Sequence, residues 1–143
     1  MITCTKTYAC IPFAHRQHLH DGHCSFVHGH NWGISITFGC TNTDENDFVV
    51  DFGKLGFIKD WISENLDHAI VLSKSDPLKD KIIAACPEVY KPYFVESCSC
   101  EGLAKHLFFV FDALVRQKTN NRAFVDCISV SEDEKNTARY SEK

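Results

Sequence analysis

Residues 26–38 read Phe26-Val27-His28-Gly29-His30-Asn31-Trp32-Gly33-Ile34-Ser35-Ile36-Thr37-Phe38. The even-numbered residues are apolar except for the two histidines, and the odd-numbered residues are small or polar. Alternation with a period of two predicts a β-strand that buries one of its faces. Both histidines therefore point toward the core from the same side of this strand.

Two inward imidazoles need polar partners, because an unpaired polar group loses free energy when it leaves water. Hydrogen bonds in the core could satisfy them, but the doubled desolvation cost favours a metal ion. His15 ends an earlier predicted strand and could complete a set of three nitrogen ligands with His28 and His30. Three protein ligands and an open fourth position are typical of catalytic zinc.

The other histidines compete for this role. His18, His20 and His23 lie in a polar loop, where solvated side chains are the simpler interpretation. His106 lies within a predicted helix, where a structural or exposed histidine is the simpler interpretation.

The length of 143 residues fits one domain, 1–143. A net charge of −4 argues against a nucleic-acid interface. No apolar run approaches the roughly 18 residues of a membrane span, and the amino terminus lacks the apolar core of a signal peptide. We therefore expect a cytoplasmic protein with reduced cysteines, although a pairing or metal role for Cys86, Cys98 and Cys100 stays open.

Hydrophobic periodicity predicts strands over residues 3–15, 26–40, 48–50 and 123–132, the second and third forming a hairpin. Asp51 is placed to cap a helix over 51–66, and Ser99 to cap a second helix that ends before a polar break at 117–122. Residues 73–96 read as an irregular connector with a short helix near 78–85, and 138–140 as a short closing strand. The fold class is α+β: a four-stranded antiparallel sheet with two helices packed on one face.

Three further sites carry chemistry of their own. Cys24 precedes His28 by four residues, and a thiol near a metal can become a base or nucleophile. Asp67 and His68 are adjacent, so we expect each side chain to serve a different partner. Glu132 either points inward at the end of the last strand, where its carboxylate needs N–H donors, or belongs to the acidic turn that follows.

Together these residues resemble the 6-pyruvoyltetrahydropterin synthase and 6-carboxytetrahydropterin synthase family. The matching blocks occur in family order across nearly the whole chain. They are Phe13-Ala14-His15-Arg16, Cys24-Ser25-Phe26-Val27-His28-Gly29-His30-Asn31, Val50-Asp51-Phe52, Leu66-Asp67-His68, Glu101-Gly102-Leu103-Ala104 and the region of Glu132.

The resemblance implies a tunnelling fold whose subunits associate through their sheets into a barrel, commonly as a homohexamer. It implies Zn²⁺ as the cofactor, bound by His15, His28 and His30. The implied partner is a small pterin substrate, with no nucleic acid and no membrane.

The resemblance also assigns catalytic roles. Cys24 is the proton-transferring base, and Asp67 and His68 complete a relay that a neighbouring subunit could supply. Glu132 anchors the amino and ring N–H groups of the pterin, and Ser99 and Glu101 contact the substrate.

The family usually has Pro-Thr-Ser/Ala-Glu where this chain has Cys98-Ser99-Cys100-Glu101. This block keeps a hydroxyl group and the acid but loses the proline, which bears on the substrate contacts.

The implied reaction converts 7,8-dihydroneopterin triphosphate to 6-carboxy-5,6,7,8-tetrahydropterin, acetaldehyde and triphosphate, in 7-deazapurine (queuosine) biosynthesis. The three-residue gap between Cys24 and His28 and the block Val49-Val50-Asp51-Phe52 favour this carboxy branch. The alternatives are a 6-pyruvoyltetrahydropterin synthase, which eliminates only triphosphate, and a non-catalytic zinc-containing pterin-binding relative. The presence of Cys24, Asp67 and His68 together favours the enzyme, since a binding protein needs none of the three.

Overall fold

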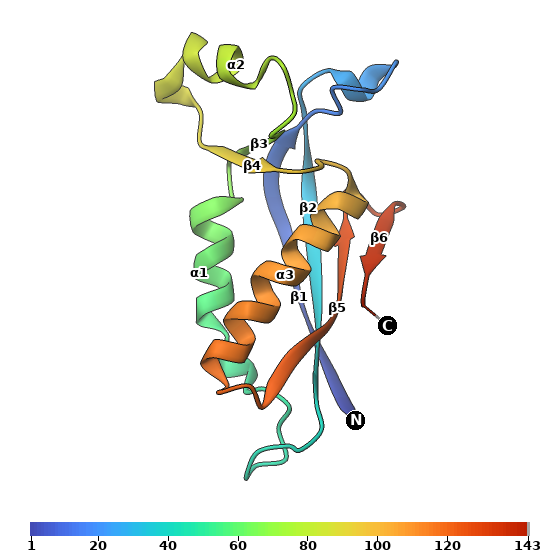
Figure 1. The fold of residues 1–143 in the computed structure, drawn as a ribbon, viewed down its shortest axis with the longest axis vertical. Coiled ribbons are helices and arrows are strands. Elements are labelled where there is room, and N and C mark those ends of the chain that lie inside the picture. Colours follow the sequence, from blue (N-terminus) through green and yellow to red (C-terminus); the bar gives the residue numbers. More distant parts are fainter. Residues whose placement is uncertain (143) are drawn as a thin grey trace.

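A computed structural model describes residues 1–142, which form one mixed sheet and three α-helices (Figure 1). The strands are β1 (Ile2–His15), β2 (His28–Cys40), β3 (Ile70–Ser73), β4 (Pro92–Val95), β5 (Ala123–Ser131) and β6 (Thr137–Tyr140). The helices are α1 (Gly56–Asn65), α2 (Lys79–Ala85) and α3 (Cys100–Lys118). The strand order is β4-β3-β1-β2-β5-β6, with β3 parallel to both of its neighbours and the other pairs antiparallel.

The core lies between the sheet and two of the helices. The predicted alternation in β2 is confirmed, because four of its even-numbered residues are fully buried: Trp32, Ile34, Ile36 and Phe38. Helices α1 and α3 lie side by side over this face (Figure 1) and bury Ile58, Leu103 and Phe111 against it. Each large apolar side chain buried in this way contributes about 1.5–3 kcal/mol, so this layer holds the fold together.

The prediction of four antiparallel strands is wrong, since the described chain has six strands in a mixed sheet. The residues of β3 are all buried, so they show no alternation that distinguishes a short strand from other buried segments. The four-residue β4 begins with Pro92 and lies at the edge of the sheet, where a missing N–H is tolerated. Both strands fall in or beside the segment that was expected to be irregular.

The predicted strand at 48–50 is also wrong. Strand β2 is already paired on both sides, with β1 and with β5, so no edge is left for a hairpin partner. The carboxylate of Asp44 instead accepts backbone N–H groups of Asn46 and Phe48, and the Arg122 side chain donates to the Phe48 carbonyl. These bonds hold a compact loop between β2 and the helical layer.

Both predicted long helices are present, but the first begins later than predicted. Asp51 accepts the N–H of Gly53 at 2.8 Å and caps a 3-10 turn, Phe52–Lys54, rather than the α-helix that starts at Gly56. Ser99 caps α3 as predicted, accepting the N–H of Gly102 at 3.0 Å. The expected short helix and closing strand are present as α2 and β6.

The opposite face of the sheet carries small polar side chains. Hydroxyl groups pair across β1 and β2, with 2.9 Å between Thr5 and Thr37 and 2.7 Å between Thr7 and Ser35. These residues are exposed or half-buried, and the helices lie on the other face.

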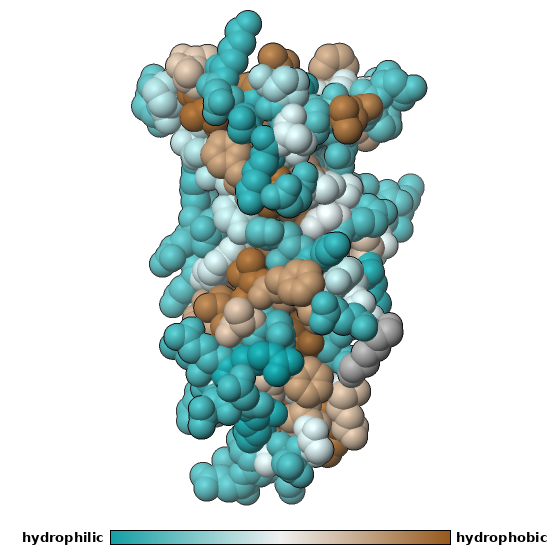
Figure 2. Space-filling view, in the orientation of Figure 1, coloured by the Kyte–Doolittle hydropathy of each residue, from teal (hydrophilic) through white to brown (hydrophobic). Residues whose placement is uncertain are grey.

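The helical side of the surface is mostly hydrophilic, with apolar groups interspersed (Figure 2). No helix within residues 1–142 combines the length and the apolar character needed to cross a bilayer.

Gly102 is required by a close approach at the start of α3. A Cβ atom there would lie 2.5 Å from the Ser97 side chain and 2.6 Å from the Ser97 carbonyl oxygen. We expect Gly102→Ala to lower the free energy of unfolding by about 1–3 kcal/mol in urea denaturation, because the backbone must shift.

Gly56→Ala is the matched control, since a Cβ on that helical glycine meets no atom within 4 Å among the described residues. It should leave stability unchanged or raise it by up to about 1 kcal/mol. Equal effects of the two substitutions would contradict the steric argument.

Candidate metal centre and active site

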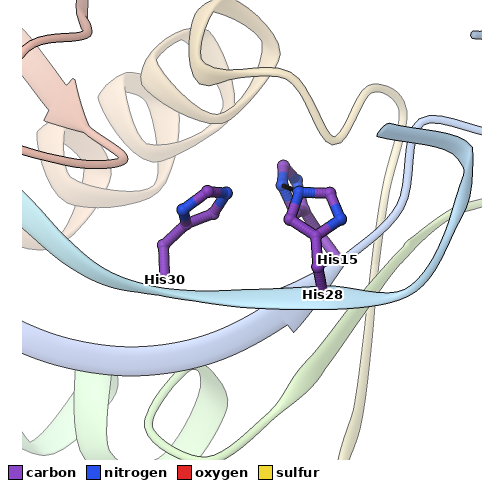
Figure 3. Close-up of side chains that lie close together, drawn as sticks. All are labelled: His15, His28 and His30. Atoms are coloured by element: carbon purple, nitrogen blue, oxygen red, sulfur yellow. Dashed lines mark hydrogen bonds between the residues drawn. The ribbon is translucent and has the colours of Figure 1, made fainter. Parts of the chain in front are cut away.

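The pairing of β1 with β2 brings three histidines together. His15, the last residue of β1, lies opposite His28, the first residue of β2, and His30 lies two residues further along the same face. The ring centroids are 4.6 Å apart for His15 and His28, 4.9 Å for His28 and His30, and 5.3 Å for His15 and His30 (Figure 3). The structure therefore gathers the three predicted ligands into one cluster.

Backbone carbonyl groups set the tautomers of two of the rings. His15 Nδ1 lies 2.8 Å from the Cys98 carbonyl oxygen, and His28 Nδ1 lies 2.7 Å from the Phe26 carbonyl oxygen. A carbonyl oxygen only accepts hydrogen bonds, so each Nδ1 donates, and in the neutral form of each ring Nε2 carries the lone pair. The two Nε2 atoms face each other at 3.1 Å.

Burial keeps the His15 imidazole uncharged. The His15 side chain is almost fully buried, and this desolvation lowers its pKa from 6.5 to about 4, with smaller effects from the Cys98 carbonyl and from His28 and His30. The imidazole is therefore neutral at neutral pH, the protonation state in which it can bind a metal.

The cluster fits a cation. Two lone pairs pointing at one another are unfavourable unless a positive charge lies between them, and His30 Nε2 is buried without a hydrogen-bond partner in the described structure. The ligand nitrogens lie within 4.8 Å of one another, so small rotations would close them around an ion with metal–nitrogen bonds of about 2.0–2.1 Å. Carbonyl groups that fix the far nitrogen are the usual support of histidine ligands.

Aromatic packing restricts the orientation of the His15 and His30 rings. The Trp32 indole stacks on Phe13 at 4.5 Å and donates its N–H to the Phe13 carbonyl oxygen. It meets His15 and His30 edge-on, at 4.8 and 5.1 Å. Since Trp32 is fully buried, these contacts leave the two imidazoles little room to turn away from the cluster.

Cys24 lies in a 3-10 turn, His23–Ser25, that precedes β2. Phe26, which was expected to begin the strand, is exposed and ends this turn by donating its N–H to the His23 carbonyl oxygen. Cys24 lines a cavity of about 830 Å³ together with three other predicted site residues, Ser99, Glu101 and Glu132. The structure thus brings one predicted catalytic residue and the three predicted substrate contacts to a single cavity.

Glu132 follows the last residue of β5, so the strand ends one residue earlier than predicted and Glu132 begins the acidic turn. Its carboxylate nevertheless faces the cluster, with Oε2 3.9 Å from His30 Nε2. It is partly exposed and lines the cavity, where a ligand could meet its oxygen atoms.

The first turn of α3 forms one wall of this cavity. The Ser99 hydroxyl caps the helix, and the Ser97 Oγ atom lies 3.1 Å from the Ser99 Oγ atom. The thiol of Cys100, the next residue, lies close to Glu132, and burial together with that charge raises its pKa to about 11. Cys100 is therefore a neutral thiol at neutral pH beside a predicted substrate anchor.

Asp67 and His68 lie elsewhere. His68 lines a separate cavity with Pro12, Ala14, Gly29 and Asn31, which alternate with core-facing residues, and also with Phe13 and His30. Neither Asp67 nor His68 lines the cavity of Cys24, so the structure does not bring the pair to Cys24 within one chain.

The expectation that Asp67 and His68 serve different partners is wrong. His68 Nδ1 lies 2.6 Å from Asp67 Oδ1, and both side chains are exposed. The reason is the left-handed backbone at His68, where φ is 61°, because this breaks the extended geometry that points neighbouring side chains apart.

The Cys98 carbonyl is a functional group that the sequence did not reveal. It orients His15 from a segment 83 residues away. Any residue can supply a carbonyl oxygen, so no residue type marks such a position. Only the altered block at 98–101 pointed to this region.

Known proteins resemble this chain in both sequence and fold. A family model described as 6-pyruvoyl tetrahydropterin synthase matches residues 3–143. The chain belongs to this family. Curated relatives named 6-carboxy-5,6,7,8-tetrahydropterin synthase include one from Rickettsia conorii, 32% identical over 108 residues, and one from Rickettsia bellii, 33% identical over 108 residues. Each match covers 75% of this chain and 78% of the relative.

Solved structures share the fold of this pterin synthase family member. An uncharacterized protein from Wolinella succinogenes superposes with a TM-score of 0.85 at 17% identity, covering 99% of this chain and 98% of its own. The 6-pyruvoyl tetrahydropterin synthase of Caenorhabditis elegans gives 0.66 at 18% identity, covering 99% and 96%. The expected α+β family fold is thereby confirmed.

The histidine cluster makes a prediction for metal binding by this family member. We expect His28→Ala to reduce zinc retained after dialysis by at least about tenfold, because loss of one ligand of three leaves a weak site. Metal content per chain is the measurement.

The control is His20→Ala, which removes an exposed loop histidine that is no part of the cluster. It should retain the zinc content of the unaltered protein. A similar loss in both variants would remove the cluster from consideration as the metal site.

Proposed function

We propose that this protein is a zinc-dependent 6-carboxy-5,6,7,8-tetrahydropterin synthase. The observation that carries the proposal is the cluster of His15, His28 and His30, with Cys24 and Glu132 at the adjoining cavity. The curated relatives named above carry this activity in their names, which supports the carboxy branch. The substrate would be 7,8-dihydroneopterin triphosphate, and the products 6-carboxytetrahydropterin, acetaldehyde and triphosphate, with uptake of one water.

The residues divide the chemistry between binding and proton transfer. Zinc bound by the three histidines would act as a Lewis acid on the side-chain oxygens of the substrate and acidify the adjacent C–H. Glu132 holds the amino and ring N–H groups of the pterin through its carboxylate, a charge-assisted interaction that fixes the ring. Ser99 and Glu101 contact the substrate from the wall formed by α3.

Cys24 takes the proton released from the substrate side chain. Its thiol is exposed and lines the cavity, where it can meet a bound substrate. His68 returns a proton while Asp67 holds its ring through the 2.6 Å contact to Nδ1.

Because Asp67 and His68 do not line the cavity of Cys24 in their own chain, a second copy of the chain supplies them. Association through the uncovered sheet face and the edges β4 and β6 would build the barrel of the family, as a homohexamer. The product would serve 7-deazapurine (queuosine) biosynthesis.

The test is turnover by zinc-loaded protein. We expect 7,8-dihydroneopterin triphosphate to give acetaldehyde and a product with the mass of 6-carboxytetrahydropterin, because Glu132 lines the cavity of Cys24 and also lies 3.9 Å from the proposed zinc ligand His30. A pyruvoyl product without acetaldehyde would assign the protein to the pyruvoyl branch instead. No turnover by zinc-loaded protein would favour a pterin-binding relative without catalysis.

Cys24→Ala separates catalysis from binding in the same assay. Turnover should fall at least about a hundredfold while zinc and pterin binding persist. Cys86→Ala, which changes another exposed thiol outside the cavity, should retain full turnover.

The shared site predicts complementation between inactive variants. We expect Cys24→Ala and His68→Ala to be inactive alone and to regain activity when unfolded together and refolded as a mixture. In random mixed assemblies about a quarter of the sites combine an intact Cys24 with an intact His68 from a neighbour. The rate relative to unaltered protein treated in the same way is the measurement, and no recovery would place both residues in one chain's own site.

A further inference from the structure

Two consecutive carbonyl groups hold the turn that carries Cys24. The Gln17 N–H donates to the Cys24 carbonyl oxygen at 2.7 Å, and Arg16 Nη1 donates to the Ser25 carbonyl oxygen at 3.0 Å. Arg16 and Gln17 directly follow His15 in the chain. The turn is thus tied to the segment next to a metal ligand by two hydrogen bonds.

Asp76 fixes the guanidinium group that makes the second of these bonds. Arg16 Nε lies 2.6 Å from Asp76 Oδ2, and Nη2 lies 3.0 Å from Oδ1. The Arg16 side chain is 14% exposed and that of Asp76 only 1%. The bidentate pair is therefore shielded from water, where such charge-assisted bonds are strong and directional.

Asp76 is itself held by the backbone. Its Oδ1 also accepts the N–H of Leu78 at 2.9 Å, at the start of the segment leading into α2. The Arg16 guanidinium and this N–H group hold the pKa of the Asp76 carboxyl below its usual range, so the pair stays charged. The Asp76 carboxylate is thereby fixed in place, and it in turn fixes the position of the Arg16 guanidinium group.

We infer that the Arg16–Asp76 pair positions Cys24 relative to the histidine cluster. This rests on the proposed function, because it assumes that Cys24 moves a proton at that site. Arg16 and Asp76 are positioning residues, since neither one lines the cavity or belongs to the cluster.

Arginine is suited to this task in a way that lysine is not. Its planar group donates to both carboxylate oxygens and to the Ser25 carbonyl at once. A lysine keeps the charge but presents one ammonium at the end of a flexible stem and cannot reproduce the three fixed directions. Arg16→Lys therefore keeps the ion pair while releasing the turn.

A second arginine–aspartate pair in the chain provides the matched control. On α3, Arg116 Nε lies 2.8 Å from Asp112 Oδ2, and Asp112 Oδ1 accepts the Val125 N–H at 2.8 Å. In both pairs one aspartate oxygen also accepts a backbone N–H, but the Arg116–Asp112 pair has a single ion contact, is more exposed and touches neither the cavity nor the cluster. Arg116→Lys measures what an arginine-to-lysine change in an aspartate pair does away from the site.

The experiment compares zinc-loaded Arg16→Lys, Asp76→Asn and Arg116→Lys with the unaltered protein. We expect kcat to fall at least about tenfold in the first two, with KM within about twofold and zinc content unchanged, because misplacement of a proton-transferring group slows chemistry more than binding. Arg116→Lys should keep the kcat of the unaltered protein. Unchanged kcat in Arg16→Lys, or an equal fall in Arg116→Lys, would overturn the inference.

Amide hydrogen exchange tests the turn without any turnover. In Arg16→Lys the N–H groups of Ser25 and Phe26, bonded within the turn, should exchange at least about tenfold faster, while Ile36 in β2 stays protected. If the unaltered protein proves inactive, the proposed function fails, and exchange alone decides whether the pair holds the turn. Unchanged exchange at Ser25 and Phe26 would overturn the inference in either case.

Discussion

The register between β1 and β2 is the constraint on which the rest of the structure depends. A shift by one residue would turn His28 and His30 to the opposite face and would expose Trp32 and the apolar residues that follow it. The same pairing that buries the core therefore assembles the histidine cluster. Stability and the candidate metal centre are consequences of one alignment, so a chain that folds in this register has already brought the three histidines together.

Local patterns predicted the parts of the fold that follow from a single element. The alternation in β2, the Ser99 cap of α3 and the short α2 could all be predicted, because each depends on neighbours within a few residues. The short strands β3 and β4 could not, since their place in the sheet comes from tertiary pairing and not from period. The same holds for residues 48–50, where a plausible strand sequence follows β2 but both sides of β2 are already paired.

The site shows the same division. His15, His28 and His30 were predicted because imidazoles that face the core from one strand need a shared polar partner, which a metal ion supplies. The cavity residues were predicted because they belong to recognisable blocks. The sequence could not show how these groups are held in place. The Cys98 carbonyl oxygen is hydrogen-bonded to His15, the backbone at His68 is left-handed, and the carboxylate of Asp76 is hydrogen-bonded to Arg16. Supporting contacts of this kind join segments that are distant in the chain.

The hydroxyl pairs on the uncovered face of the sheet have a consequence of their own. In each pair, Thr5 with Thr37 and Thr7 with Ser35, either oxygen can be the donor, so the outward lone pairs and protons can be exchanged by a simple rotation. These groups carry no charge and do not titrate in the physiological range. The two hydroxyl pairs can therefore adapt their hydrogen bonding to water or to a similar surface without gaining or losing charge.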